Sequence, residues 1–201
     1  MQRLCFFLSI LVFTSLLVGC ASNANAQSQE IKSVESSTPT DLPEKPTPTE
    51  VATLESVPLN PPVNCPVTVP QNPLFTPPAP YNTLGFKDHF WFGSNSLWTL
   101  IPANGVWGGL PYDPPTGLTQ KIFWWREGYV WAEEPQPNLI VTGERLDASA
   151  PPLSASKATN AYASDIGSAM LVGVDLPTLG CWKITGQYKE TELSFVVWVA
   201  Q

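Results

Sequence analysis

Histidine and methionine are nearly absent from this chain of 201 residues, which contains one histidine and two methionines. A metal centre or a histidine-activated nucleophile would therefore depend on His89 alone. The Gly-x-Ser-x-Gly turn that presents a serine nucleophile in many hydrolases is also missing. The sequence accordingly favours a protein that is not an enzyme and that has neither a metal site nor a cofactor.

Basic residues are scarce as well, with 10 Lys and Arg against 17 Asp and Glu and a formal net charge of −7. Nucleic-acid binding requires a basic run or a basic patch interleaved with aromatic residues, because the ligand carries a negative charge at every phosphate. Neither pattern occurs in the sequence. We therefore expect no nucleic-acid partner.

The longest apolar run is short for a permanent membrane span. It extends from Leu4 to Val18 and covers about 22 Å of a hydrocarbon core about 30 Å thick. Its position after Arg3 is typical of a secretion signal, here residues 1–19. The run ends in Leu17-Val18-Gly19-Cys20, which resembles the lipobox of bacterial lipoproteins. That resemblance predicts that Cys20 receives a lipid before the signal is cut off.

Lipidation of Cys20 would anchor the chain to a bacterial cell membrane or outer membrane, with its folded part outside the cytoplasm. Two or three acyl chains, such as palmitate, hold a protein stably, whereas one binds only marginally. The membrane is therefore the first predicted partner. Two alternatives remain open: an ordinary signal peptide cut elsewhere, for example at Ala24-Asn25-Ala26, and an uncleaved anchor.

Residues 20–62 lack aromatic side chains and are rich in serine, threonine, proline and glutamate. Such a segment cannot bury enough apolar surface to offset the entropy lost on ordering, so we expect a disordered tether. A flexible chain of this length reaches about 35 Å. The tether is either a spacer that lifts the folded domain off the membrane or a linker with no length requirement.

The sequence contains only four cysteines. Cys5 would leave with the signal and Cys20 would carry the lipid, so Cys65 and Cys181 remain in the exported domain. Two such cysteines predict a disulfide that joins the beginning of the domain to a strand near its end.

Residues 63–201 contain all eight tryptophans and show no convincing helical periodicity. Runs of aromatic and β-branched residues alternate with Gly, Pro, Asn and Asp, which predicts an all-β domain. We interpret it as a single immunoglobulin-like β-sandwich of about seven to nine strands. The expected strands lie near residues 89–93, 96–101, 105–109, 120–126, 138–145, 168–174, 181–188 and 193–200.

The last two expected strands show the clearest alternation of apolar and polar residues and are predicted to form a hairpin. Trp182 falls on the apolar face and is expected in the core, beside the disulfide. Trp198 falls on the opposite face from Phe195. It must therefore cover a second layer or lie exposed.

A succession of short strings runs through this domain: Cys65-Pro66-Val67-Thr68, Ser96-Leu97-Trp98-Thr99, Phe123-Trp124-Trp125-Arg126, Arg145-Leu146-Asp147-Ala148, Ala150-Pro151-Pro152-Leu153, Gly180-Cys181-Trp182-Lys183-Ile184-Thr185-Gly186 and Phe195-Val196-Val197-Trp198-Val199. The succession resembles a family of uncharacterised exported bacterial proteins, many of which are lipoproteins. The resemblance implies one exported domain with a Cys65–Cys181 disulfide, and it implies no particular chemistry. Two positions depart from the pattern, because Lys183 stands where an acidic residue is common and Glu144 where a basic one is.

Asp88-His89 and Glu133-Glu134 are the candidate catalytic groups, and both favour an ordinary surface role. Adjacent residues of a strand point to opposite faces, so Asp88 is not expected to orient His89. A glycosidase needs two carboxyl groups that face each other across a sugar, about 5 to 9 Å apart, which neighbours in a loop do not provide. An envelope hydrolase is therefore the least favoured function.

The candidate recognition residues are aromatic or lie in the segment 146–167, a long stretch of Ala, Ser, Pro and Asn between two expected strands. Loops of this length are often functional. We expect Lys157 and Tyr162 of this segment to border a recognition surface with exposed tryptophans. Burial in the core is the commoner role of tryptophan, but an exposed indole also stacks well on a sugar ring. The candidate stacking groups are Trp107, Trp125 and Trp131.

The features favour a non-enzymatic lipoprotein of the bacterial envelope whose domain binds a partner protein or another envelope component. The alternative is a carbohydrate-binding or cell-wall-binding module. A purely structural role is a further possibility, and an envelope hydrolase ranks last.

Overall fold

A computed structural model describes residues 57–83 and 86–201 of the chain. The predicted signal peptide, the predicted lipidation site Cys20 and the predicted tether up to residue 56 lie outside the described residues. Within the described ranges, no helix is both long enough and apolar enough to cross a membrane.

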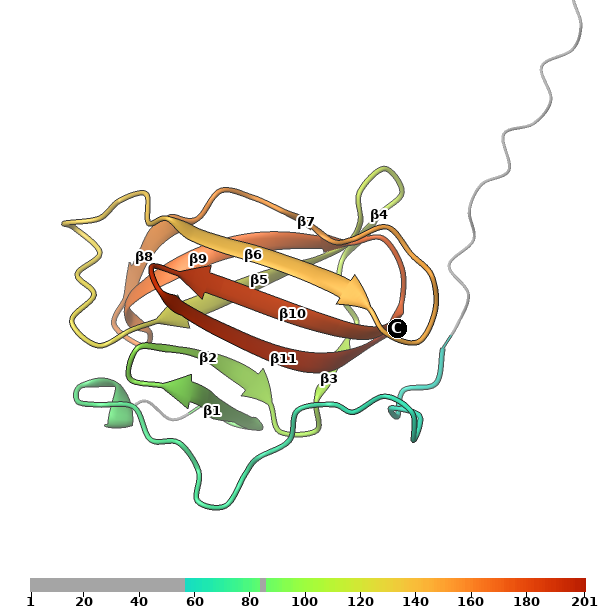
Figure 1. The fold of residues 1–201 in the computed structure, drawn as a ribbon, viewed down its shortest axis with the longest axis horizontal. Coiled ribbons are helices and arrows are strands. Elements are labelled where there is room, and N and C mark those ends of the chain that lie inside the picture. The colour runs from blue at the N-terminus through green and yellow to red at the C-terminus, as the bar shows by residue number, and fades with distance from the viewer. Residues whose placement is uncertain (1–56, 84–85) are drawn as a thin grey trace, which may run out of the picture. The chain divides into compact units, whose positions relative to one another are not determined.

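Two β-sheets packed face to face form the domain, as Figure 1 shows. The larger sheet runs β1-β2-β5-β9-β7, and in addition β4 pairs with β5 and β8 with β9. Its strands are β1 (His89–Ser94), β2 (Leu97–Pro102), β4 (Tyr112–Asp113), β5 (Gly117–Trp125), β7 (Ser154–Ala155), β8 (Thr159–Ala163) and β9 (Gly167–Leu176). The smaller sheet runs in the order β3 (Val106–Gly108), β11 (Thr191–Ala200), β10 (Gly180–Tyr188) and β6 (Leu139–Arg145).

This architecture confirms the predicted all-β sandwich, and each of the eight expected strands is present. The described residues hold eleven strands, more than expected, because β4, β7 and β8 were not predicted. β4 and β7 have two residues each, too few to show an alternation, and β8 reads Thr-Asn-Ala-Tyr-Ala without a large aliphatic residue. The long segment 146–167 therefore contains two short strands of the larger sheet.

The core between the sheets is built largely from bulky side chains. Trp182 and Ile184 of β10 are fully buried there, in one cluster with Trp124 of β5. Between these strands, a Cβ atom at Gly186 would overlap the six-membered ring of Trp124. Glycine at this position therefore lets the indole of one sheet lie directly against the backbone of the other.

The disulfide joins Cys65 to Cys181 on the outer face of the smaller sheet, with a Cα–Cα distance of 5.6 Å. The predicted disulfide is thus confirmed. Trp182 is in the core as expected, but the expectation that it packs beside the disulfide is wrong, because adjacent residues of β10 point to opposite faces. The tryptophan that shares a cluster with the disulfide is Trp198, the cross-strand partner of Cys181.

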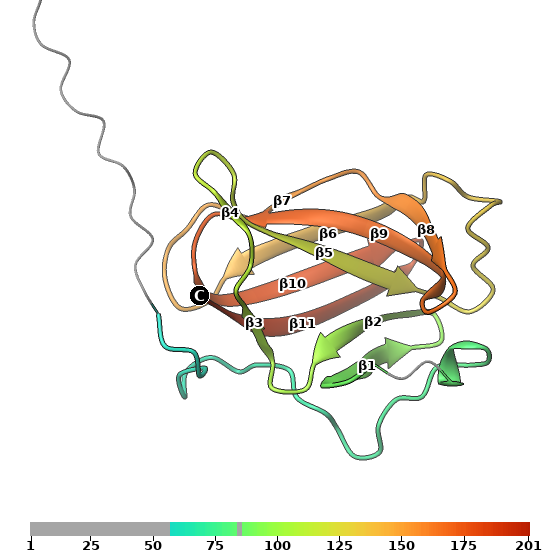
Figure 2. The ribbon, with the colours of Figure 1, turned by 180° about the vertical axis from the view of Figure 1, so that it is seen from behind.

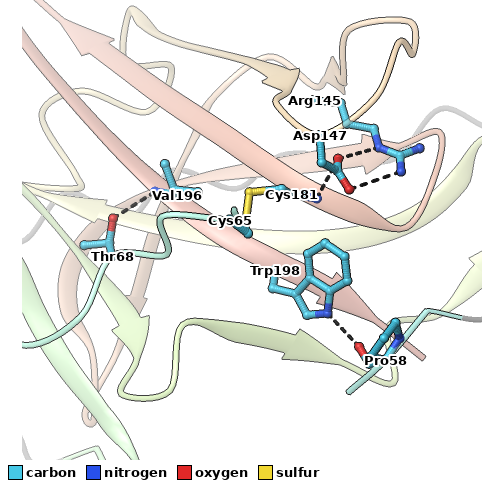
Figure 3. Close-up of a disulfide and its surroundings, with 8 residues drawn as sticks. All are labelled: Pro58, Cys65, Thr68, Arg145, Asp147, Cys181, Val196 and Trp198. Carbon is cyan, nitrogen blue, oxygen red and sulfur yellow. Dashed lines mark hydrogen bonds and ion pairs between the residues drawn. A yellow bond between two sulfur atoms is a disulfide. The ribbon is translucent and has the colours of Figure 1, made fainter. Parts of the chain in front are cut away.

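A leading segment, residues 57–68, covers this outer face, as Figure 3 shows. The Trp198 indole is 3% exposed, and its Nε1 donates a hydrogen bond to the Pro58 carbonyl oxygen at 2.7 Å. Thr68 exchanges two bonds with Val196, one from its backbone N–H at 2.8 Å and one to its Oγ1 at 2.9 Å. Trp198 therefore covers a second layer, and contacts with the sandwich begin before the expected domain boundary at residue 63.

The outer face of the larger sheet is covered too. Trp98 and Trp125 form a buried cluster there with Tyr81, which lies in the short helix η1 (Tyr81–Thr83). The Trp125 Nε1 donates to the Ile166 carbonyl oxygen at 2.9 Å. The two sheets are thus enclosed from both outer sides as well as packed against each other.

The two ends of the sandwich differ. Figures 1 and 2 show the C-terminus and the start of the described chain, in cyan, at one end. The strand ends that carry the disulfide and Trp198 lie there as well, and we refer to it as the disulfide end. The yellow loop between β5 and β6 lies at the other end together with β8, in both views. We refer to this as the far end.

Candidate recognition site

The three candidate tryptophans have different surroundings. Trp107 is 6% exposed and Trp125 1% exposed, whereas Trp131 is 40% exposed. The Trp107 ring packs edge-on against Phe195, with ring centroids 6.1 Å apart. Trp125 packs edge-on against Trp91 at 5.1 Å. The prediction that Trp107 or Trp125 presents a ring to a ligand is therefore wrong, and Trp131 is the candidate that remains.

Trp131 and Tyr162 form a stacked pair at the surface of the far end. Their ring centroids lie 5.6 Å apart and their planes are inclined by 24°. Tyr162, on β8, is 61% exposed, and Trp131 lies in the loop between β5 and β6. The structure thus brings together two predicted site residues that are 31 positions apart in the sequence. We call them the aromatic pair.

Asn160 fixes the loop of Trp131 to the strand of Tyr162. Its side-chain Nδ2 donates to the Trp131 carbonyl oxygen at 2.6 Å, and its backbone N–H donates to the Pro135 carbonyl oxygen at 3.1 Å. Because these bonds hold the loop backbone against β8, the two rings are placed before any ligand arrives. Such pre-organisation lowers the entropy lost on binding.

Glu134 ties the same loop to the body of the sandwich. Its backbone carbonyl accepts a bond from the Tyr129 hydroxyl at 2.9 Å, and its carboxylate accepts one from the Tyr188 hydroxyl. Burial, and then the nearby charge of Glu134, raise the pKa of Tyr129 to about 12. Burial, followed by the bond to Glu134 and its charge, likewise raises the pKa of Tyr188 to about 12. Both hydroxyls therefore keep their protons at neutral pH and act as donors.

Lys157 is exposed and lines a shallow hollow next to the aromatic pair, which we call the side hollow. The side hollow has a volume of about 430 Å³ and lies between residues 136–141 and residues 155–159. It adjoins the aromatic pair through Asn160, which follows Thr159 of the hollow and bonds to Pro135 just before Gln136. Chain connectivity through Thr159 and Asn160 thus links the side hollow, which includes Lys157, to the aromatic pair.

The candidate catalytic groups are not arranged for catalysis. The Nδ1 of His89 lies 2.8 Å from the Lys87 carbonyl oxygen, so this nitrogen does not face the neighbouring Asp88 carboxylate. The hollow beside His89 is lined by no serine, threonine or cysteine. Glu134 is engaged by Tyr188, whereas Glu133 is exposed. Among residues 57–83 and 86–201, no cluster of three or more His, Cys, Asp or Glu side chains is placed to hold a metal ion.

Asn160, Glu134 and Tyr188 support the site and were not predicted from the sequence. Asn160 is a single amide within a polar stretch, and nothing in its neighbours marks it. Tyr188 ends the expected strand 181–188, but its contact with Glu134 joins residues 54 positions apart, which no local pattern reveals. Comparison with known proteins adds nothing to these contacts: the chain matches no protein-family model, no curated protein and no solved structure.

Proposed function

We propose that this chain is a lipid-anchored protein of the bacterial envelope whose β-sandwich binds an envelope component without catalysing a reaction. The observation that carries the proposal is the exposed stack of Trp131 on Tyr162. Exposed large aromatic side chains on a rigid frame are typical of recognition surfaces. Here two hydrogen bonds of Asn160 hold the backbone of the Trp131 loop to β8, the strand that carries Tyr162.

The placement of the aromatic pair suits an anchored protein. The described chain begins at the disulfide end, and the aromatic pair belongs to the far end (Figures 1 and 2). A lipid on Cys20 would attach the domain through its leading side. The aromatic pair, at the opposite end, would be clear of the attachment point and accessible to envelope components.

A binding test of the purified full chain in detergent decides this proposal. The chain is sedimented with isolated cell envelopes of its own host, and the bound fraction is compared with that of Trp131→Ala. We expect the variant to bind about tenfold more weakly, the effect of removing a central aromatic anchor. The control is Tyr112→Ala, which removes another exposed aromatic ring, 39% exposed, on β4.

Equal binding of the Trp131→Ala variant and the unchanged chain would overturn the proposed site. Loss of binding in the Tyr112→Ala control as well would also contradict it, because the effect would not depend on the aromatic pair. The thermal unfolding midpoint of each variant is measured in parallel, so that a folding defect is not mistaken for a binding defect.

A further inference from the structure

We propose that the ligand is an acidic saccharide chain, with one sugar ring stacked on the aromatic pair and an anionic group beside Lys157. This inference rests on the proposed function and names the class of its ligand. The surface concerned consists of the aromatic pair and the side hollow.

The aromatic pair offers what a sugar ring requires. A sugar presents a patch of C–H groups on its face and hydroxyls at its rim, so it packs flat against an aromatic ring while its hydroxyls seek polar partners. In a stack, each ring keeps one face turned away from the other. Within the described ranges, the Trp131 Nε1 has no protein hydrogen-bond partner, so this donor is free for a hydroxyl.

The side hollow supplies further polar groups. Gln136, Asn138 and Thr159 line it, and none of their side chains bonds to another residue in the part of the chain that the structure describes. Ile140 contributes an apolar surface, because its side chain is 53% exposed. Free amides and a hydroxyl beside an apolar patch match the alternating hydroxyls and C–H groups of a saccharide.

Lys157 is the one charged residue that lines the side hollow. Over residues 57–83 and 86–201 it takes part in no ion pair; the ion pairs present there are Arg145–Asp147 and Lys183–Glu144. A single unpaired cation in a hollow without carboxylates favours a ligand with a carboxylate or phosphate group.

An extended peptide fits this surface less well. It would add to the free edge of β6, which borders the side hollow. The Leu153 N–H donates to the Gly143 carbonyl oxygen at 3.2 Å, so the later part of this edge is occupied. Backbone groups alternate in direction along a strand, so among the earlier residues of β6 only Leu139 and Val141 point their backbone groups toward the free edge. Strands are usually about five or six residues long. The free part of the edge is therefore too short to pair with an added peptide strand.

Selective destruction of envelope components tests the ligand class. Host envelopes are digested with protease, and a portion is then treated with periodate, which cleaves sugar diols, or with lysozyme, which cleaves glycan strands. We expect the full chain to bind protease-treated envelopes as tightly as untreated ones and to lose binding after one of the two saccharide treatments, lysozyme for a glycan strand of the wall and periodate for a saccharide that carries vicinal diols. Loss of binding on protease digestion, or binding that survives all treatments, would overturn the proposal that the ligand is a saccharide.

The charged part of the proposal is tested with Lys157→Ala on protease-treated envelopes. The variant should bind about two- to fivefold more weakly at low salt, and the difference should shrink at high salt because salt screens the attraction. The matched control is Lys87→Ala, an exposed lysine outside the side hollow. Equal losses in both variants, or none in Lys157→Ala, would contradict an anionic ligand at this point.

These outcomes are distinguishable from failure of the proposed function. If untreated envelopes do not bind in a Trp131-dependent way, the recognition site itself is wrong. If they do bind in that way but protease digestion of the envelopes abolishes the binding, the recognition site stands and the proposal of a saccharide ligand is wrong.

Discussion

Tryptophan has opposite roles at the two ends of this sandwich. At the disulfide end, Trp198 is 3% exposed and its Nε1 donates to the Pro58 carbonyl oxygen. At the far end, Trp131 is 40% exposed and contacts Tyr162. The Trp198 indole contacts other residues of the domain and its N–H is hydrogen-bonded. The Trp131 indole stacks on Tyr162 through one face, and its N–H has no partner among the described residues. The comparison separates residues that hold the fold from residues available to a ligand.

The disulfide end also carries a half-buried ion pair. Arg145 Nε lies 2.8 Å from Asp147 Oδ1, and the same oxygen accepts the Cys181 backbone N–H at 3.1 Å (Figure 3). Burial alone would raise the pKa of Asp147, but the bonds from Arg145 and Cys181 and the charge of Arg145 lower it below its ordinary value. A charge network therefore fixes β6 to β10 where the disulfide joins the leading segment.

The largest effect on stability is expected from removing the disulfide. Cys65→Ser combined with Cys181→Ser frees a loop of 116 residues in the unfolded chain. The free energy of unfolding should fall by up to about 5 kcal/mol in the chain-entropy account. Urea unfolding of the full chain in detergent measures it. A fall below about 1 kcal/mol would mean that the contacts of Trp198 and Thr68 alone hold the leading segment.

The next largest effect is expected from Asp147→Asn. It leaves the Arg145 guanidinium, whose side chain is 18% exposed, without its anionic partner, and should lower the free energy of unfolding by about 2 to 3 kcal/mol. The control is Glu144→Gln, which breaks the exposed 3.7 Å pair with Lys183 and should change stability by about 0 to 1 kcal/mol. If both variants lowered the free energy of unfolding equally, the half-buried pair would contribute no more to stability than the exposed pair.

The Asp147 contribution depends on pH in a defined direction. Its pKa is lowered from 3.8 in the folded chain, so the charged form contributes stability above about 3.8 and this contribution is lost as the pH falls through the folded pKa. The stability difference between the unchanged chain and Asp147→Asn should therefore stay constant at neutral pH and shrink as the pH falls below about 3.8. A difference that grows on acidification would contradict the lowered pKa.

A smaller effect is expected from single indole N–H groups. Trp198→Phe removes the donor to Pro58 and should lower the free energy of unfolding by about 1 kcal/mol. Trp131→Phe removes an N–H without a partner in the described chain and should change stability by less than about 0.5 kcal/mol. Thermal unfolding of both variants makes the comparison. An equal shift would mean that the Pro58 bond contributes nothing.

Much of the fold could be predicted from the sequence because the main strands are long enough to show alternation. The disulfide followed from counting the cysteines that would remain after the predicted export. The outer layers could not be predicted, because the cover of Trp125 comes from Tyr81 and Ile166, and that of Trp198 from Pro58, all distant in sequence. The alternation of a strand shows which face a side chain takes but not what lies over that face.

The same limit explains the candidate site. Trp107 and Trp125 lie in strands and are buried, Trp107 in the core between the sheets and Trp125 under an outer layer, whereas Trp131 lies in a loop and is exposed. Its stack on Tyr162 depends on Asn160, whose two bonds cross between the loop and β8. The two positions that depart from the family resemblance prove to be partners, since Lys183 lies opposite Glu144 and pairs with it.

The central claim is that the far end of the sandwich binds an envelope component, whereas the disulfide end stabilises the fold. The most direct test measures both envelope binding and the free energy of unfolding for two double variants, Trp131→Ala with Tyr162→Ala, and Cys65→Ser with Cys181→Ser. The first should lose binding by at least about tenfold with little change in stability, and the second should lose stability while its folded fraction binds normally. Unchanged binding in the first variant would contradict the claim.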